Sequence, residues 1–287
     1  MINNLILIHN INPIAFSYNN FQLSWYWFFY IVDIVIVYGF LKLLEKNKII
    51  TFSSTSERLD LLLYPWIGLI IGARLFYVLI YDPKVFIENP QLIFQFWHGG
   101  MSFHGGIVGV LFGLYLFTRS YRKKNNNNRS FFFYSDTIVT AIPCALALGR
   151  LGNFLNQELV GRISYGRWPW LVHFPLHDFP SHDYDPEKII YRHPTQLYEM
   201  FFECLLLFIV LWVYKKNILN RPKMQTIIFL YWIAIMRFII EFFREPDKEI
   251  GFILNYFTLG QVLSFLLLLF AIGVHLMERR ALKKAFR

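Results

Sequence analysis

Charged and glycine-rich clusters interrupt the apolar stretches of this 287-residue chain. In the first cluster, residues 99–106, four glycines surround His104. Glycines permit close backbone approach and expose N–H groups, which suits an anionic headgroup, and histidine is the side chain best able to move protons near neutral pH. The structural alternative is a glycine-rich helix start with a hydrogen-bonded histidine.

Arginines and carboxylates mark the other two clusters. Residues 149–162 contain two arginines, two asparagines and a glutamate, and an arginine fork binds phosphate oxygens at two points. In the third cluster, Arg237, Glu241 and Arg244 have the i, i+4, i+7 spacing of one helical face. Internal ion pairs or arginines that snorkel from a helix end would explain part of this pattern without catalysis.

Charged residues also lie within or at the ends of the apolar segments. Each costs at least about 2.5 kcal/mol at the centre of a membrane helix. Pairing alone does not explain why glycine clusters accompany these charges, which weakens the ion-pair explanation for the set as a whole. The residues concerned are Asp33, Arg74, His104, Asp136, Arg150, Glu199, Glu203, Arg237 and Glu241.

Seven apolar segments must position these clusters, since about 20 apolar residues span a bilayer. The composition agrees, because 56% of the residues are hydrophobic and only 16% are charged, whereas a soluble domain has about 25% charged residues. We predict an all-α polytopic membrane protein with one transmembrane domain, residues 1–287. The predicted spans are residues 22–41, 61–80, 97–117, 132–151, 197–214, 225–243 and 253–276.

Lysine and arginine concentrate in alternate loops. Most of the 28 basic residues lie in 42–59, 119–129, 215–223 and the C-terminal tail, whereas residues 1–21 contain none. Because basic residues favour the cytoplasmic side, we predict a periplasmic N-terminus, a cytoplasmic C-terminus and a small periplasmic head at 155–195. The net charge of +9 is then a topology signal, and no nucleic acid is expected. All three clusters fall near the outer half of the membrane.

Neither a metal site nor a disulfide is expected. His173, His177 and His182 have a metal-like spacing, but their loop is broken by prolines and lacks suitably spaced acidic residues. Cys144 and Cys204 lie in separate apolar stretches, where cysteine usually acts as a small buried hydrophobic residue.

The motifs resemble those of the prolipoprotein diacylglyceryl transferase family. The resemblance extends from about residue 13 to residue 276 and is most specific in 149–162. The matching segments are GGMSFHGG (99–106), GRLGNFLNQELVGR (149–162), HPTQLYE (193–199), RFIIEFFREPD (237–247), Leu23–Tyr26 and Gly72–Leu75.

This resemblance implies a function. The family transfers the diacylglyceryl group of phosphatidylglycerol to the lipobox cysteine of a prolipoprotein signal peptide, at the periplasmic face of the bacterial inner membrane. It releases glycerol phosphate and uses no cofactor. Both substrates come from the lipid bilayer, so a lateral opening between spans is expected.

The resemblance also implies site residues, by their positions in the matching segments. The family's functional positions correspond to Tyr26, His104, Arg150, Asn153, Glu158, Gly161 and Arg237, with Arg150 and Arg237 near the phosphate. We predict His104, Arg150 and Arg237 as catalytic residues. The predicted substrate-binding residues are Arg150, Tyr26, Arg74, Asn153, Glu158, Gly161, Glu241 and Arg244.

Two positions depart from the family pattern. Gln157 stands where the family usually has glycine. Ile233 replaces a tyrosine that the family often has one helical turn before Arg237, and Tyr231 is a candidate to substitute for it. Neither departure removes a charged group, so we expect activity.

The residue types suit this chemistry. A thiol has a pKa of about 8.5, so only a few per cent is ionised near neutral pH, and a positioned histidine that accepts the proton is worth about 10²–10⁴-fold in rate. Arginines would stabilise the departing phosphate. Two alternatives remain: a transporter of a small solute or lipid, which intramembrane charges also suit, and another lipid-modifying transferase.

Overall fold

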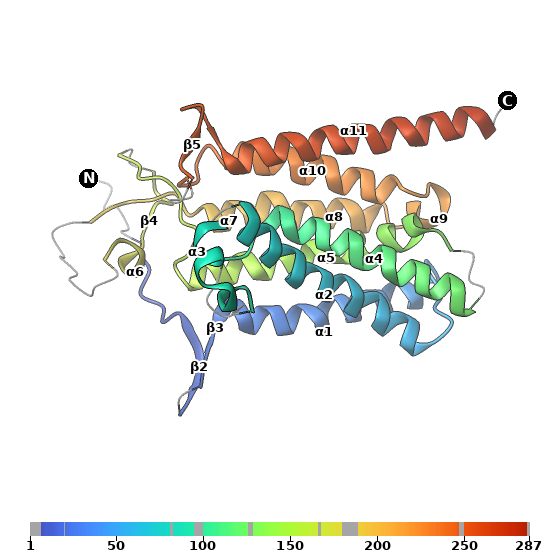
Figure 1. Ribbon diagram of the computed structural model, residues 1–287, viewed down its shortest axis with the longest axis horizontal. Helices are drawn as coiled ribbons and strands as arrows, with labels where there is room; N and C mark the ends of the chain where they lie inside the picture. Colours follow the sequence, from blue (N-terminus) through green and yellow to red (C-terminus); the bar gives the residue numbers. More distant parts are fainter. Residues whose placement is uncertain are drawn as a thin grey trace.

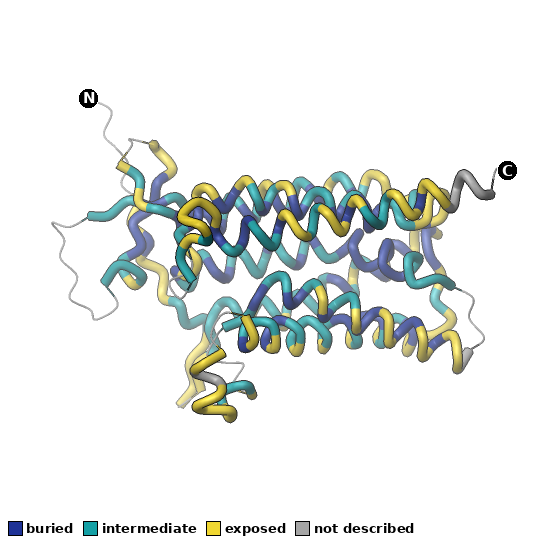
Figure 2. The backbone as a smooth tube through the Cα atoms, turned by 45° about the horizontal axis from the view of Figure 1, so that its top comes forward, coloured by how far each residue is buried: buried dark blue, intermediate teal, exposed yellow. Residues whose placement is uncertain are grey.

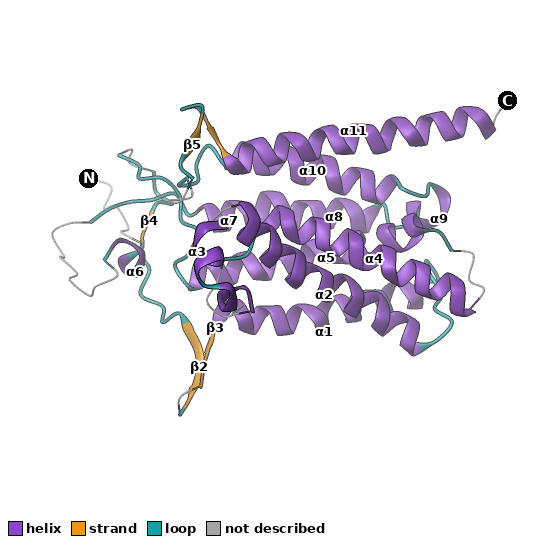
Figure 3. Cartoon of the chain, viewed as in Figure 1, coloured by secondary structure: helices purple, strands orange, loops and turns teal. Residues whose placement is uncertain are grey.

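The computed structural model confirms a mostly helical chain, with strands confined to short pairs at one end (Figure 3). Gly99, His182 and Asp247, which the sequence analysis singled out, lie outside the described residues. The described residues are 7–19, 21–80, 83–94, 100–125, 129–165, 168–179, 189–246 and 250–285.

Long helices lie side by side in a bundle (Figure 1). Each of the seven predicted apolar segments overlaps one of these helices or, in one case, a continuous helical run. The single helices are α1 (Trp25–Lys46), α2 (Thr55–Ile80), α4 (Phe103–Asn125), α5 (Phe131–Leu155), α10 (Met224–Ile240) and α11 (Leu259–Ala285). The run consists of α7 (Thr195–Tyr198), the π-helical turn η3 (Glu199–Leu205) and α8 (Leu206–Val213).

Five of the described helices are long and apolar enough to cross a membrane. They are α1, α2, α5, the run from α7 to α8, and α11 as far as Arg280. The apolar helix α10 is shorter, with 17 residues. A multi-pass membrane protein is therefore supported by the structure.

Short elements gather mainly at one end of the bundle, where β2, β4, α6 and β5 are seen in Figure 1. β1 pairs with β4 in parallel, whereas β2 with β3 and β5 with β6 pair antiparallel. The short elements are β1 (Leu7–Ile8), β2 (Ile14–Tyr18), β3 (Phe21–Ser24), α3 (Pro83–Glu88), η1 (Pro90–Phe94), β4 (Val172–His173), α6 (Pro175–Asp178), α9 (Asn217–Asn220), β5 (Phe252–Ile253) and β6 (Phe257–Thr258).

Helix α5 is the most enclosed of the candidate spans. Of its apolar window, 61% is buried, against 17–33% in the other four, and exposed positions follow the outer sides of the bundle (Figure 2). Asp136 of α5 accepts hydrogen bonds from the backbone N–H groups of Lys223 (2.7 Å) and Thr226 (2.9 Å). This carboxyl caps the start of α10, whose own N-cap residue makes no side-chain cap. The central helix thus fixes the helix that carries Arg237.

Helices α2 and α4 pack through facing glycines. A Cβ added at Gly68 would lie 2.2 Å from the carbonyl oxygen of Gly109, and one at Gly72 would lie 2.5 Å from that of Gly105. Small residues permit this close contact between membrane helices. Gly105, from the first sequence cluster, therefore serves helix packing and holds the adjacent His104 beside α2.

Candidate functional site

A cavity of about 490 Å³ lies between α1, α2, α4, α5 and α10. Most of its wall is apolar. The polar residues near the ends of these helices that the sequence analysis predicted as site residues gather at one region of this wall. Seven of them line the cavity: Tyr26, His104, Arg150, Asn153, Arg237, Glu241 and Arg244.

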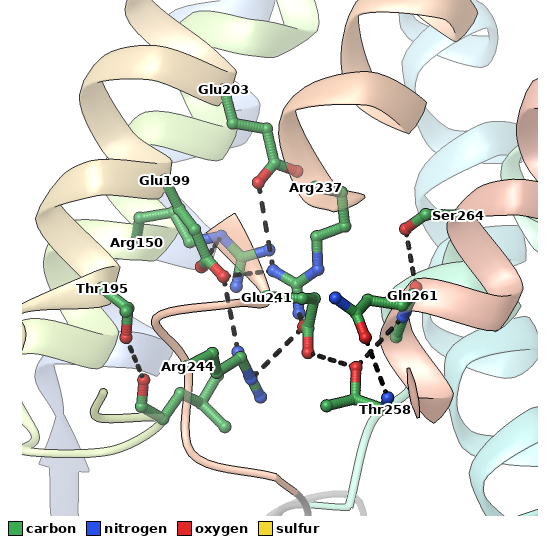
Figure 4. Close-up of polar contacts among 12 residues, drawn as sticks. Arg150, Thr195, Glu199, Glu203, Arg237, Glu241, Arg244, Thr258, Gln261 and Ser264 are labelled. Atoms are coloured by element: carbon green, nitrogen blue, oxygen red, sulfur yellow. Dashed lines mark hydrogen bonds and ion pairs between the residues drawn. The ribbon is translucent and has the colours of Figure 1, made fainter. Parts of the chain in front are cut away.

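Glu199 is the centre of a buried ion cluster beside this cavity (Figure 4). Its Oε2 lies 3.0 Å from Nε of Arg150, and its Oε1 accepts a hydrogen bond from Arg237 and lies 3.5 Å from a terminal nitrogen of Arg244. Only 1% of the Glu199 side chain is exposed. One carboxylate therefore holds three guanidinium groups together in a site where unpaired charge would be costly.

Two further glutamates balance the arginines. Glu203 Oε2 lies 3.9 Å from a terminal nitrogen of Arg237, and Glu241 Oε1 lies 2.9 Å from the other terminal nitrogen and 3.6 Å from Nε of Arg244. The Arg237–Glu241 pair is the internal ion pair that the spacing suggested. Glu203 lies in η3, and π-helical turns of this kind are frequent at functional sites.

The start of α11 supports Glu241 from its other side. Thr258 Oγ1 donates to Glu241 Oε2 at 2.9 Å, and the Thr258 N–H donates to Gln261 Oε1 at 3.1 Å. A Cβ at Gly260 would lie 2.5 Å from Cδ of Glu241. The absence of a side chain at this position gives the carboxylate its space.

Arg150 retains unused binding capacity. It contacts Glu199 through Nε, and its two terminal nitrogens make no ion pair among the described residues. The Phe103 ring lies 5.5 Å from Cζ of Arg150 and 5.7 Å from Cζ of Arg237. A cation–π contact with each guanidinium helps two like charges share one site.

His104 follows Phe103 in the first turn of α4 and lines the cavity. Its Nε2 is buried and has no hydrogen-bond partner in the described part of the chain. The alternative of a hydrogen-bonded histidine is therefore not met at this nitrogen, which is available to a bound molecule.

Tyr26, Asn153 and Glu158 form the neighbouring wall and loop. The Tyr26 and Tyr30 hydroxyls are 2.9 Å apart, with one donating to the other. Asn153 and Asn156 donate from their side-chain amides to the Glu158 carboxyl at 3.5 and 3.3 Å. These hydrogen bonds hold Glu158 in the loop that follows α5, and Glu158 does not line the cavity itself.

Gly161 and Arg74 both contact backbone carbonyl groups of neighbouring segments. A Cβ at Gly161 would lie 2.3 Å from the carbonyl oxygen of His193 and 2.8 Å from that of Phe243, so only glycine fits where these three segments meet. Arg74 donates to the carbonyl oxygens of Ile93 (3.2 Å), Gly100 (3.1 Å) and Leu92. Neither residue lines the cavity, and substrate binding by either one stays a prediction.

The two departures from the family pattern have different surroundings. Gln157 has a φ of 57°, in the left-handed region that favours glycine. Its amide compensates by donating to the carbonyl oxygen of His9 (3.0 Å) and accepting from the Leu176 N–H (2.9 Å). Ile233 is fully buried, and the Tyr231 hydroxyl lies 3.3 Å from Nδ1 of His275 on α11, outside the cavity lining. Whether Tyr231 substitutes for the family's tyrosine stays a prediction.

The loops at the end of the bundle that contains β4 and α6 hold a separate ion network. Arg192 lies 2.7 Å from Asp178 and 2.9 Å from Glu245, and His177 lies 3.2 Å from Asp178. Burial alone would raise the pKa of Asp178, but the hydrogen bonds from His177 and Arg192 bring it below its ordinary value. Within the described residues, no group of three histidine, cysteine or acidic side chains could hold a metal ion.

The sequence analysis missed several residues of the site. Glu199 and Glu203 were recognised as charges within an apolar segment but were not assigned to the site, although the same signal selected Arg150. Phe103 and Thr258 gave no signal, because an aromatic or a hydroxyl side chain is unremarkable at a helix end.

Comparisons with known proteins assign the chain to a family. The family described as prolipoprotein diacylglyceryl transferase matches residues 13–277. Three similar proteins are each called phosphatidylglycerol–prolipoprotein diacylglyceryl transferase. The protein of Rickettsia typhi is 40% identical over 267 residues (92% of this chain, 95% of that protein). The protein of Psychrobacter arcticus is 39% identical over 276 residues (90% of each chain), and that of Legionella pneumophila is 38% identical over 269 residues (92% and 95%).

Proposed function

The chain belongs to the prolipoprotein diacylglyceryl transferase family, and we propose that it transfers the diacylglyceryl group of phosphatidylglycerol to the lipobox cysteine thiol of prolipoproteins, the first step of lipoprotein maturation. The observation that carries this proposal is the position of Arg150, Arg237 and His104 together on a cavity whose wall is mostly apolar. The family match favours this transferase over the transporter and over a different lipid-modifying enzyme.

In the proposed reaction, Arg150 and Arg237 bind the phosphate while the apolar wall accommodates the acyl chains. His104 Nε2 accepts the thiol proton. The sulfur then attacks C3 of the glycerol, and a C–S bond forms as the C–O bond to phosphate breaks. The electron pair leaves with oxygen as glycerol phosphate, whose charge the arginines stabilise. These steps use side chains of the protein alone.

Product analysis tests this function directly. Purified protein, phosphatidylglycerol and a lipobox peptide should yield a diacylglyceryl peptide joined through a thioether, with glycerol phosphate released in equal amount. Mass spectrometry of the peptide detects the product. A protein that only moves solute or lipid leaves the peptide unmodified.

The membrane arrangement that we propose has seven crossings in the bacterial inner membrane, with α4 and α10 added to the five candidate spans. The basic segments support it, since the ends of α1, α4 and α11 and the short helix α9 lie at the same end of the bundle (Figure 1). The opposite end, with β4 and α6, is then periplasmic and contains the proposed head, residues 155–195, within one transmembrane domain.

A reporter fused after Lys124 is expected to read as cytoplasmic. A second reporter inserted near Asp183, which lies outside the described residues, is expected to read as periplasmic. The reason is the strong lysine and arginine bias between the two sides. Alkaline phosphatase and fluorescent-protein fusions measure the side of the membrane on which each reporter lies. If both reporters read the opposite way, the site faces the cytoplasm and the arrangement is wrong.

His104→Asn is expected to lower the transfer rate about 100-fold near neutral pH, because asparagine cannot accept the thiol proton. Part of the rate should return as the pH approaches the thiol pKa of about 8.5, where the substrate ionises unaided. Lipid affinity should change little, because Arg150 and Arg237 remain.

The measurement is the rate against pH for wild type, His104→Asn and the control His275→Asn, whose histidine contacts Tyr231 away from the cavity. A constant ratio of wild-type to His104→Asn rates between about pH 6.5 and about pH 9 would exclude proton transfer. In that case His104 serves as a headgroup ligand.

A further inference from the structure

Two polar atoms in the membrane-embedded wall of the cavity have no role in the reaction proposed above. Oδ1 of Asp33, on α1, and Nε1 of Trp66, on α2, are both buried and lack a hydrogen-bond partner among the described residues. Both residues line the same cavity as Arg150 and His104. Buried polar atoms are normally hydrogen-bonded, so an orphaned pair on one cavity indicates a ligand with polar atoms at that position.

The depth of these atoms relates them to the arginines. Gly152 of α5 is level with Tyr26 of α1, since a Cβ at Gly152 would lie 2.9 Å from the Tyr26 Cα. On α1, Asp33 is seven residues beyond Tyr26, and on α5, Arg150 is two residues before Gly152. With a rise of about 1.5 Å per residue, Asp33 therefore lies roughly 7 Å further along the bundle axis than Arg150.

The depth of Trp66 follows in the same way from its position on α2. Gly72 packs against Gly105, the neighbour of His104, and Trp66 is six residues before Gly72, or about 9 Å further inward. Asp33 and Trp66 therefore share a level below the arginines and His104. A phospholipid whose phosphate binds Arg150 has its glycerol ester groups a few bonds below, in the direction of the acyl chains.

The side chains of Asp33 and Trp66 both act as hydrogen-bond donors at this depth. An indole N–H can only donate. An unpaired carboxylate among apolar groups is so costly that the group takes up a proton instead, and the neutral carboxyl then also donates. An ester carbonyl oxygen has lone pairs to accept both bonds, and it is the polar group that a diacylglyceryl lipid has between headgroup and chains.

We propose that Asp33 and Trp66 form a recognition site for the ester carbonyl groups of the bound lipid, so that the enzyme selects diacyl over dialkyl glycerolipids. This inference rests on the proposed function. The esters take no part in the bond changes at C3, so a diether phosphatidylglycerol stays chemically competent. Selection between the two lipids is then a matter of binding at this site alone.

The test compares kcat/KM for diester and diether phosphatidylglycerol of equal chain length with a lipobox peptide. Wild type is expected to prefer the diester by about tenfold, the size of one or two net hydrogen bonds. Trp66→Phe and Asp33→Leu, which remove one donor each, should reduce this preference about threefold or more. Asp33→Asn keeps a donating N–H and should retain the preference.

Trp212→Phe is the matched control, because Trp212 packs on Phe40 and Phe208 and does not line the cavity. The ratio of two lipids within one variant does not depend on how much protein is folded. An unchanged ratio in both Trp66→Phe and Asp33→Leu overturns the inference. Absence of product from wild type with the diester lipid overturns the proposed function instead, so the two failures are distinguishable.

Discussion

Glu199→Ala is expected to lower the transfer rate by at least about 100-fold and the free energy of unfolding by about 3–5 kcal/mol, the usual cost of breaking a buried ion pair. The carboxylate contacts Arg150, Arg237 and Arg244 at once. Without it, three positive charges repel one another inside the protein. The arginines that we assign to the phosphate then lose their common anchor. Glu199→Gln, which keeps one acceptor oxygen, should fall between wild type and the alanine variant.

The measurements are initial rates with phosphatidylglycerol and a lipobox peptide, and thermal unfolding in detergent. Glu45→Ala is the matched control, because the Glu45–Arg58 pair is more exposed, with 33% of the Glu45 side chain accessible. Such a pair is worth about 0–1 kcal/mol. A Glu199→Ala protein with a rate near that of wild type would show that Glu199 does not organise the site.

Arg150→Lys is expected to lose nearly as much activity as Arg150→Ala, at least about 100-fold. Arg150 uses Nε for Glu199 at 3.0 Å, and its two terminal nitrogens remain for the phosphate oxygens. Lysine has one nitrogen and no planar fork. It can keep the contact with Glu199 or reach the phosphate, but it cannot do both with this geometry.

The rates of the Lys and Ala variants with phosphatidylglycerol decide this point, with Arg58→Lys as the control because Arg58 pairs with Glu45 away from the cavity. If Arg150→Lys retains most of the activity, positive charge alone suffices at this position. Two-point binding of the phosphate is then not required.

Several features of this protein follow from the sequence alone. The seven apolar segments all overlap helices or a helical run, because the length of an apolar stretch is a local property. The predicted helical face of Arg237, Glu241 and Arg244 is only partly correct, because α10 ends at Ile240 and Arg244 pairs with Gly161 in an isolated β-bridge. All three side chains are nevertheless buried. The motif in residues 149–162 identified the family.

Only the tertiary structure decided which helix faces meet. Glu199 became the centre of the site because η3 lies against both α5 and α10. Gly105 packs against Gly72, and Asp33 and Trp66 share one cavity wall although 33 residues separate them. Spacing along a chain determines the faces of a single helix, but the rotation and depth of one helix against another depend on side-chain packing between segments distant in sequence.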